Sequence, residues 1–137
     1  MTHKDVVEFI EPFRMLMLAT IGANGRAYAS TAPFVRKEDC FYVFVSTVAQ
    51  HGRNLLQAEH ASILFAADEG DTVQPFARKR LTAEVSVKEI LRDRKLFQEI
   101  LALFSDVFDR ELVEQLERMR DFHLFELVPE SASMVIG

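Results

Sequence analysis

Three consecutive cations, Arg78-Lys79-Arg80, are the first residues in this sequence whose types and spacing suggest chemistry. An Arg guanidinium offers a two-pronged hydrogen-bond donor to a phosphate or carboxylate, and a Lys ammonium adds a point charge. Because the chain as a whole carries a net charge of −5, this local cationic run predicts a clamp for one small anion. Cations also discourage an edge strand from pairing with other chains, so a solubilised edge strand is the alternative interpretation.

A second group of candidate residues lies where hydroxyl side chains precede a short polar helix. Thr47 and Gln50 have the Thr-x-x-Gln spacing of a capping box, which predicts that a helix begins after Thr47. A helix N-terminus presents free backbone N–H groups and the positive end of the helix dipole, and both suit a phosphate. Ser46 adds a second hydroxyl, and His51 and Asn54 share one face of the helix. Alternatively, Thr47 only caps the helix, and the imidazole of His51 is a surface group.

Other chemistries have weaker support. The only cysteine is Cys40, which excludes an intramolecular disulfide and a thiolate metal site. We expect no metal site, because the four histidines have no ligand-like spacing. The sequence also has no Gly-x-Ser-x-Gly elbow and no glycine-rich phosphate loop. The histidines are His3, His51, His60 and His123.

Length and composition favour one globular domain that spans residues 1–137. Apolar residues make up 49% and charged residues 27% of the chain, which is typical of a folded protein. The acidic balance disfavours nucleic acid and anionic lipid as partners. No apolar run approaches the roughly 20 residues that a membrane-spanning helix needs, and the polar N-terminus does not read as a secretory signal. We therefore expect a cytoplasmic protein that binds a small molecule.

The elements that position these residues can be read from periodicity and turn signals. Alternating apolar and polar residues predict strands, and apolar residues three or four positions apart predict helices. Asn24-Gly25 is a hairpin signal because both residues tolerate positive φ. The predicted strands are Met15–Ile21, Ala27–Val35, Phe41–Ser46, Ser62–Ala67, Phe76–Val87, Phe122–Val128 and Ser131–Ile136. The predicted helices are a short one ended near Pro12, one after Thr47, and a two-piece one over Glu89–Met119 that Asp109 caps in the middle.

This order of elements indicates an α+β protein with a mainly antiparallel sheet. About six or seven short strands are most economically closed into a barrel, because closure removes exposed edges. Flanking helices would cover part of the barrel. One small barrel leaves apolar strand surface exposed, so we also expect a homodimer that buries it.

Several strings resemble the FMN-binding split barrels, the superfamily of pyridoxamine 5′-phosphate oxidase. The opening hairpin carries Leu18-Ala19-Thr20, Asn24-Gly25-Arg26 and Ala29-Ser30-Thr31-Ala32-Pro33-Phe34-Val35. Three further strings resemble the heme-utilisation branch of that superfamily, and the match runs in order from about Met15 to Gly137. They are Ala49-Gln50-His51-Gly52-Arg53-Asn54-Leu55, Phe76-Ala77-Arg78-Lys79-Arg80-Leu81-Thr82 and Asp121-Phe122-His123-Leu124-Phe125-Glu126-Leu127-Val128-Pro129.

The resemblance implies a split-barrel homodimer with cofactor pockets at the subunit interface. In flavin-binding members the second strand lines the isoalloxazine, and basic and hydroxyl groups hold the phosphate. Carried over, the ring would be lined by Ser30, Ala32 and Pro33, and the phosphate would be held by Ser46, Thr47, Arg78, Lys79 and Arg80. FMN would then supply the hydride or electron chemistry of an oxidoreductase.

In the heme-utilisation branch the same interface holds heme, and the matching residues here are His51, Arg80 and Asp121. Arg80 would pair with a propionate, and Asp121 would orient an axial histidine. Heme-degrading members carry that histidine in a tail beyond the last strand, and this sequence ends at Gly137. Because the cations and the helix N-terminus suit a phosphate, FMN is the expected cofactor. The alternatives are a heme-binding or heme-degrading protein and a dimeric module without cofactor.

Overall fold

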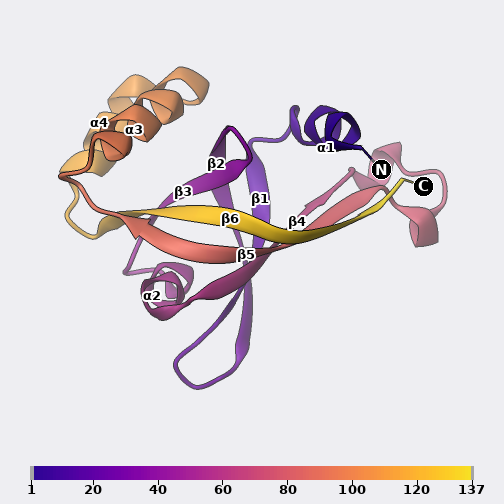
Figure 1. Cartoon of the computed structure of the whole chain (residues 1–137), viewed down its shortest axis with the longest axis horizontal. Helices are drawn as coiled ribbons and strands as arrows, with labels where there is room; N and C mark the ends of the chain where they lie inside the picture. Colours follow the sequence, from indigo (N-terminus) through magenta and orange to yellow (C-terminus); the bar gives the residue numbers. More distant parts are fainter. Residues whose placement is uncertain (1, 137) are drawn as a thin grey trace.

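The structure is a computed structural model that describes residues 2–136. Within these residues six strands form one closed antiparallel barrel in the order β1-β2-β3-β6-β5-β4 (Figure 1). The expected α+β split barrel with flanking helices is thereby confirmed. The strands are β1 (Met15–Ile21), β2 (Ala27–Lys37), β3 (Cys40–Ser46), β4 (His60–Ala66), β5 (Arg80–Ile90) and β6 (Phe122–Val135). The helices are α1 (His3–Ile10), α2 (Gln50–Gln57), α3 (Lys95–Val107) and α4 (Arg110–Arg118).

The β1–β2 hairpin forms at the predicted turn. Gly25 adopts a φ of 78°, which a side-chain-bearing residue rarely reaches. The backbone N–H of Gly22 donates to the carbonyl of Arg26 at 2.9 Å, and Ile21 pairs with Ala27. The Asn-Gly prediction is confirmed, and the hairpin extends beyond the barrel in Figure 1.

The last two predicted strands are one strand, so the barrel has six strands rather than seven. β6 continues through Pro129, which lies opposite Val85, and the register shifts between Glu84 and Val85. Proline has no N–H to donate to a neighbouring strand, and a bulge accommodates it without ending the pairing. The prediction that Pro129 interrupts the strand was therefore wrong.

The strand predicted over Phe76–Val87 begins later, at Arg80, and runs on to Ile90. Pro75–Ala77 form a 3-10 turn instead, in which the side chain of Gln74 accepts from the backbone N–H of Phe76. Arg78 and Lys79 thus precede the strand, contrary to the prediction. The helix expected from Glu89 likewise begins only at Lys95, because the first part of that range pairs with β6.

Helices α3 and α4 cover one side of the barrel, whereas α1 and α2 add Phe9, Ile10 and Leu55 to the core inside it. The outward side chains of β3, Tyr42 and Phe44, are buried together with Ile100 and Phe104 of α3. The inward side chains of all six strands form a separate core inside the barrel. The outer face of β1, β2 and β4 has no such cover within the described chain, and Met15 and several other apolar residues are exposed on it. This uncovered face is where a ligand or a second chain can pack.

Candidate functional site

His51 is joined to the barrel by a hydrogen bond. Its Nδ1 lies 2.9 Å from the Oγ of Ser30, which connects α2 to β2. The imidazole is half-buried, and this burial lowers the pKa of His51 below its usual 6.5 because the charged form loses hydration. A neutral ring is the form that binds a metal or accepts a hydrogen bond. Two residues that the sequence singled out separately, Ser30 and His51, thus meet at one place.

Asn54, which shares a helix face with His51, is buried and serves the fold. Its Nδ2 donates to the Oγ1 of Thr20 at 3.0 Å, and its Oδ1 accepts from the Nε2 of Gln50 at 2.7 Å. The Oε1 of Gln50 accepts from the guanidinium of Arg53 at 2.9 Å, and the Thr47 N–H donates to the Asp121 carbonyl, so Gln50 does not reach back to a helix cap. The predicted capping box is therefore wrong, and the N-cap residue is Ala49, without a side-chain cap.

Gly52 is a site residue that sequence reasoning missed. A Cβ placed on it would lie 2.1 Å from the backbone oxygen of Ser46, so the end of β3 and the first turn of α2 are in direct backbone contact. The available signal was a glycine inside a predicted helix, where it costs about 1 kcal/mol relative to alanine without a packing reason. The close approach supplies that reason.

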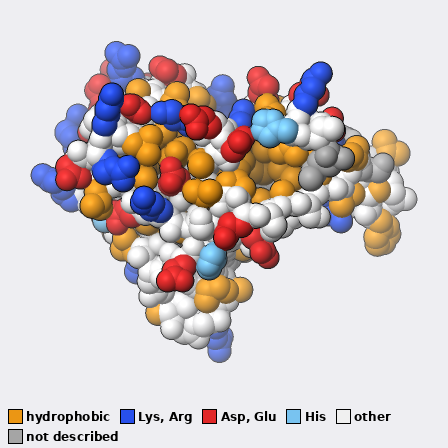
Figure 2. All heavy atoms as spheres, in the orientation of Figure 1, with side chains coloured by type: hydrophobic (Ala, Val, Ile, Leu, Met, Phe, Trp, Pro, Cys, Tyr) orange, Lys and Arg blue, Asp and Glu red, His pale blue; other side chains and the backbone are white. Residues whose placement is uncertain are grey.

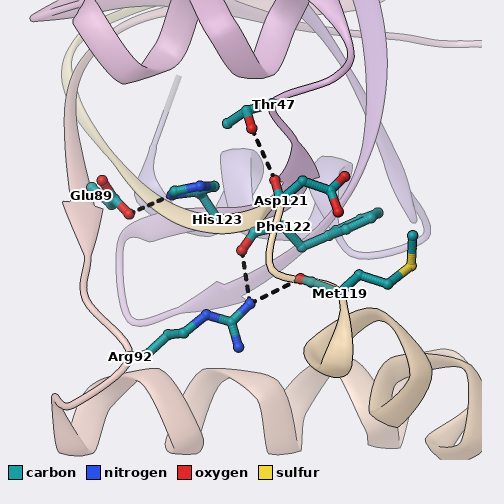
Figure 3. Close-up of polar contacts among 7 residues, drawn as sticks. All are labelled: Thr47, Glu89, Arg92, Met119, Asp121, Phe122 and His123. Carbon is teal, nitrogen blue, oxygen red and sulfur yellow. Dashed lines mark hydrogen bonds and ion pairs between the residues drawn. The ribbon is translucent and has the colours of Figure 1, made fainter.

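Ser46 and Thr47 are both hydrogen-bonded to Asp121. The Oγ of Ser46 donates to the Asp121 carboxylate, and the Thr47 backbone N–H donates to the Asp121 carbonyl at 2.8 Å. The Thr47 hydroxyl donates to the same carbonyl at 3.2 Å, as drawn in Figure 3. The structure thus brings three predicted site residues together, but their hydroxyl groups bind a carboxylate and a carbonyl.

Arg92 is the second residue that sequence reasoning missed. Its guanidinium donates to the backbone carbonyls of Glu117, Met119 and Phe122 at 2.7, 3.2 and 3.0 Å, and it lies 5.4 Å above the ring of Phe97. Figure 3 shows it beneath the turn that carries Asp121. One arginine among the charged residues after a strand gives no sequence signal, because its acceptors belong to a turn about 25 residues away.

His123 stands next to this turn but faces a different partner. Its Nδ1 lies 2.7 Å from the Oε2 of Glu89, an ion pair when the ring is protonated, and both side chains are about 30% exposed. Figure 3 places this pair on the β5 side, apart from the Asp121 carboxylate. In residues 2–136 no three His, Cys, Asp or Glu side chains are grouped so that they could hold a metal ion.

The three cations of the first candidate site do not converge. The Nε of Arg78 donates to the carbonyl of Ala67, and the Nζ of Lys79 lies 5.1 Å from the ring centroid of Phe9. Arg80 donates from Nη1 to the carbonyl of Arg78 at 3.0 Å. Within one chain they therefore form no single anion clamp, although Arg80 leaves β5 on the same face as the exposed Thr82.

An apolar hollow of about 500 Å³ lies on the uncovered outer face of the barrel. Ser30, the partner of His51, is one of its lining residues. It pairs with the buried Leu18, however, so its hydroxyl points to the inner face of β2, and the imidazole lies on the other side of the strand from the hollow. Of the other predicted ring-lining residues, Ala32 is buried inside the barrel and Pro33 is exposed on the outer face. The lining consists of Met17, Leu18, Ala19, Ala29, Ser30, Thr31, Ser62, Ile63, Leu64 and Thr82.

A larger cavity of about 720 Å³ lies away from these residues, between α1, the segment after β4 and the end of β6. Phe9, Phe13 and Met134 contribute to its apolar lining, and charged residues of both signs, among them Asp5 and Lys79, stand around it. Figure 2 shows the orange floor of this hollow. Of the polar site residues described above, only Lys79 lines this cavity.

The two halves of the candidate site are far apart in one chain. Arg80 pairs with Val135 at one end of the β5–β6 ribbon, whereas Asp121 directly precedes the other end of β6, where Leu124 pairs with Ile90. Ten residues of β5 separate these ends, which corresponds to roughly 30 Å at the usual rise of a strand. One small cofactor in one chain therefore cannot contact both Arg80 and Asp121.

Comparisons with known proteins agree with the split barrel. The family model described as pyridoxamine 5′-phosphate oxidase matches residues 2–136, and the chain belongs to this family. Within it, the chain is similar to the heme oxygenase HutZ of Vibrio cholerae, with 37% identity over 97% of this chain and 75% of that protein.

Solved structures give the same picture. A crystal structure of Vibrio cholerae HutZ, described as a heme storage protein, superposes with a TM-score of 0.88 at 35% identity, covering 96% of this chain and 93% of that one. Campylobacter jejuni ChuZ gives a TM-score of 0.87 at 30% identity over 98% of this chain and 55% of that one. The resemblance to the heme-utilisation branch is confirmed. No helix among the described residues has the length and apolarity to cross a membrane.

Proposed function

We propose that this protein binds heme at the interface between two copies of the chain and acts in heme utilisation. This reverses the order expected from the sequence, in which FMN came first. The support from relatives is that HutZ, 37% identical over almost the whole chain, is named a heme oxygenase. The support from the chain itself comes from the uncovered face of the barrel and from His51.

The observation that carries the proposal is the apolar hollow on the uncovered outer face of the barrel, a face that the cation Arg80 shares. Heme combines a large apolar ring with an iron that binds neutral imidazole and with two carboxylates. The hollow offers apolar surface, and burial keeps His51 neutral. Arg80, on the same outer face as Thr82 of the hollow, would hold a propionate through its guanidinium. These residues fit the group, which when bound would supply the redox chemistry of its iron.

A second copy would complete the site. Arg80 lies at one end of the barrel, and His51, Ser46 and Asp121 lie toward the other. A two-fold axis across the outer face would set the Arg80 end of one copy against the His51 end of the other, because such an interface pairs each patch with the same patch reversed. Two observations support the proposed homodimer, the uncovered apolar face and the separation of the site residues.

FMN is the second candidate, favoured by the three cations and by the family to which the chain belongs. Its phosphate would need hydroxyl donors, and here the hydroxyl groups of Ser46 and Thr47 already bind Asp121. The cations also diverge within one chain. The contacts of these residues therefore favour heme over FMN.

The test is a visible absorption spectrum of the purified protein, before and after addition of hemin and then, separately, of FMN. Heme binding predicts a sharp Soret band that survives gel filtration, and a shifted band in His51→Ala. Retained flavin absorption without a Soret band would replace heme by FMN. Retention of neither would leave the cofactor-free dimeric module. Sedimentation of the same samples measures the dimer independently of the cofactor.

A further inference from the structure

The segment between β4 and β5, residues 67–79, projects from the barrel and exposes two large apolar side chains. We call it the arm. Val73 is 102% exposed and Phe76 is 95% exposed relative to the free residue. In Figure 1 the arm stands beyond the end of the barrel, and in Figure 2 orange side chains form that tip. Fully exposed large apolar side chains on one projecting segment are a feature of surfaces that bind another protein.

The exposure is built into the arm by its own hydrogen bonds. The Thr72 hydroxyl donates to the Asp68 carbonyl at 2.8 Å, and the backbone N–H of Ala77 donates to the Gln74 carbonyl at 3.0 Å. At the base, the backbone N–H of Ala67 donates to the Lys79 carbonyl at 2.8 Å. These bonds fold the arm into two short turns, so Val73 and Phe76 are held outward.

The same chain carries a complementary surface on its β1–β2 hairpin. Next to its turn, beyond the hollow, the outward side chains are apolar, with Ile21 at 53% exposure and the exposed Ala27 opposite it. Arg26 is exposed at the turn of this hairpin. The first turn of the arm carries the opposite charge, from the exposed Asp68, Glu69 and Asp71, whereas its two cations, Arg78 and Lys79, lie at its base.

We infer that the arm of one copy packs on the outer face of the β1–β2 hairpin of a second copy. Apolar Val73 and Phe76 would cover Ile21 and its neighbours, and the acidic side chains would face Arg26. The arm is attached at the Arg80 end of the barrel, and the turn of the hairpin lies at the other end. In a two-fold dimer the two copies run in opposite directions, so each arm meets the hairpin of the other copy. This inference rests on the proposed dimer and names the elements that hold it.

The first test is the dissociation constant of the dimer, measured by sedimentation for the whole chain. Because these variants remove the burial of a large apolar side chain from the interface, Phe76→Ser and the pair Val73→Ser and Phe76→Ser should weaken the dimer at least tenfold. Leu112→Ser, at a 46% exposed position of α4, is the matched control and should change nothing. Far-UV circular dichroism and thermal unfolding verify that each variant folds.

The second test determines which surface of the other copy the arm contacts. Ile21→Ser should weaken the dimer as Phe76→Ser does, and the double variant should be little worse than either, because contacting residues are not additive. A photoreactive benzophenone side chain at position 76 should cross-link to residues 15–36 of the other copy, which isotope-labelled mixed dimers distinguish from the same copy.

The outcomes separate the two proposals. A dimer that forms with unchanged affinity in the arm variants, or a cross-link confined to one copy, would overturn the arm inference and leave the dimer standing. A wild-type protein that stays monomeric at micromolar concentration would overturn both.

Discussion

The Oγ of Ser30 on β2 lies 2.9 Å from the Nδ1 of His51 on α2. Ser30 pairs with the buried Leu18, so this contact ties α2 to the inner face of β2. It fixes the orientation of an imidazole whose pKa is lowered by burial. The ring therefore lies on the opposite side of β2 from the apolar hollow.

His51 should make the stability of the protein pH-dependent. Its pKa is lowered in the folded state and returns toward 6.5 on unfolding, so the unfolded chain binds more protons between the two values. The free energy of unfolding should then rise with pH through this window, reach its full value above about 6.5, and fall as the pH drops through the lower pKa. Urea unfolding from about pH 5 to pH 8 measures it.

The matched variant is His51→Gln, which keeps a polar side chain and removes the titration. Its free energy of unfolding should depend less on pH over the same range. Equal pH dependence in the two proteins would show that His51 does not titrate with a lowered pKa.

Arg92→Met should destabilise the protein and displace Asp121. Methionine keeps the apolar contact with Phe97 but leaves three carbonyl acceptors without their guanidinium donor. We expect a loss of about 1–3 kcal/mol in the free energy of unfolding. Denaturant unfolding measures the loss, and amide NMR shifts of Ser46 and Thr47, which contact Asp121, report its displacement.

Arg94→Met is the control, because Arg94 is exposed and two residues away. It should change the free energy of unfolding by less than about 0.5 kcal/mol. Equal effects of the two variants would indicate a general charge effect in place of the specific contacts.

Gly52→Ala should disrupt the junction of β3 and α2. The added Cβ would lie 2.1 Å from the Ser46 backbone oxygen, so strand and helix must move apart. Such overpacking costs about 1–3 kcal/mol, and occasionally more. Gly70→Ala is the control, since nothing lies within 4 Å of its Cβ position. Thermal unfolding of both variants should show a lower midpoint for the first alone.

Arg80→Ala should weaken hemin binding without dissociating the dimer. The loss of one charge-assisted contact to a carboxylate is worth about 1.5–3 kcal/mol, which corresponds to at least a tenfold weaker affinity. Lys88→Ala removes one positive charge from the far part of the same strand and is the control. Hemin titration followed at the Soret band measures both. Unchanged binding in Arg80→Ala would show that this cation holds no heme carboxylate; the edge-strand interpretation is already wrong, because β5 pairs with β4 on one side and β6 on the other.

Periodicity and turn signals were sufficient for most of the barrel. Met15–Ile21 was predicted with the bounds that the structure has, because it is an apolar run of strand length that a hairpin turn signal follows directly. The start of β5 was not predictable in this way. Alternation continues through Phe76–Lys79, and only local hydrogen bonds of Gln74 and Pro75 turn this segment into the arm. The continuity of β6 through Pro129 was missed because the bulge that accommodates this proline depends on the pairing with β5.

The sequence by itself determined the α+β class, the hairpin at Asn24-Gly25 and the family, because these depend on local residue types and on strings that read in order. Tertiary structure decided which candidates meet. Ser30 contacts His51, 21 positions along the chain, and Ser46 contacts Asp121, 75 positions along, whereas the adjacent residues Arg78, Lys79 and Arg80 point to three different partners. Neighbours in sequence diverge when a strand begins between them, and distant residues converge only where barrel closure brings their elements together.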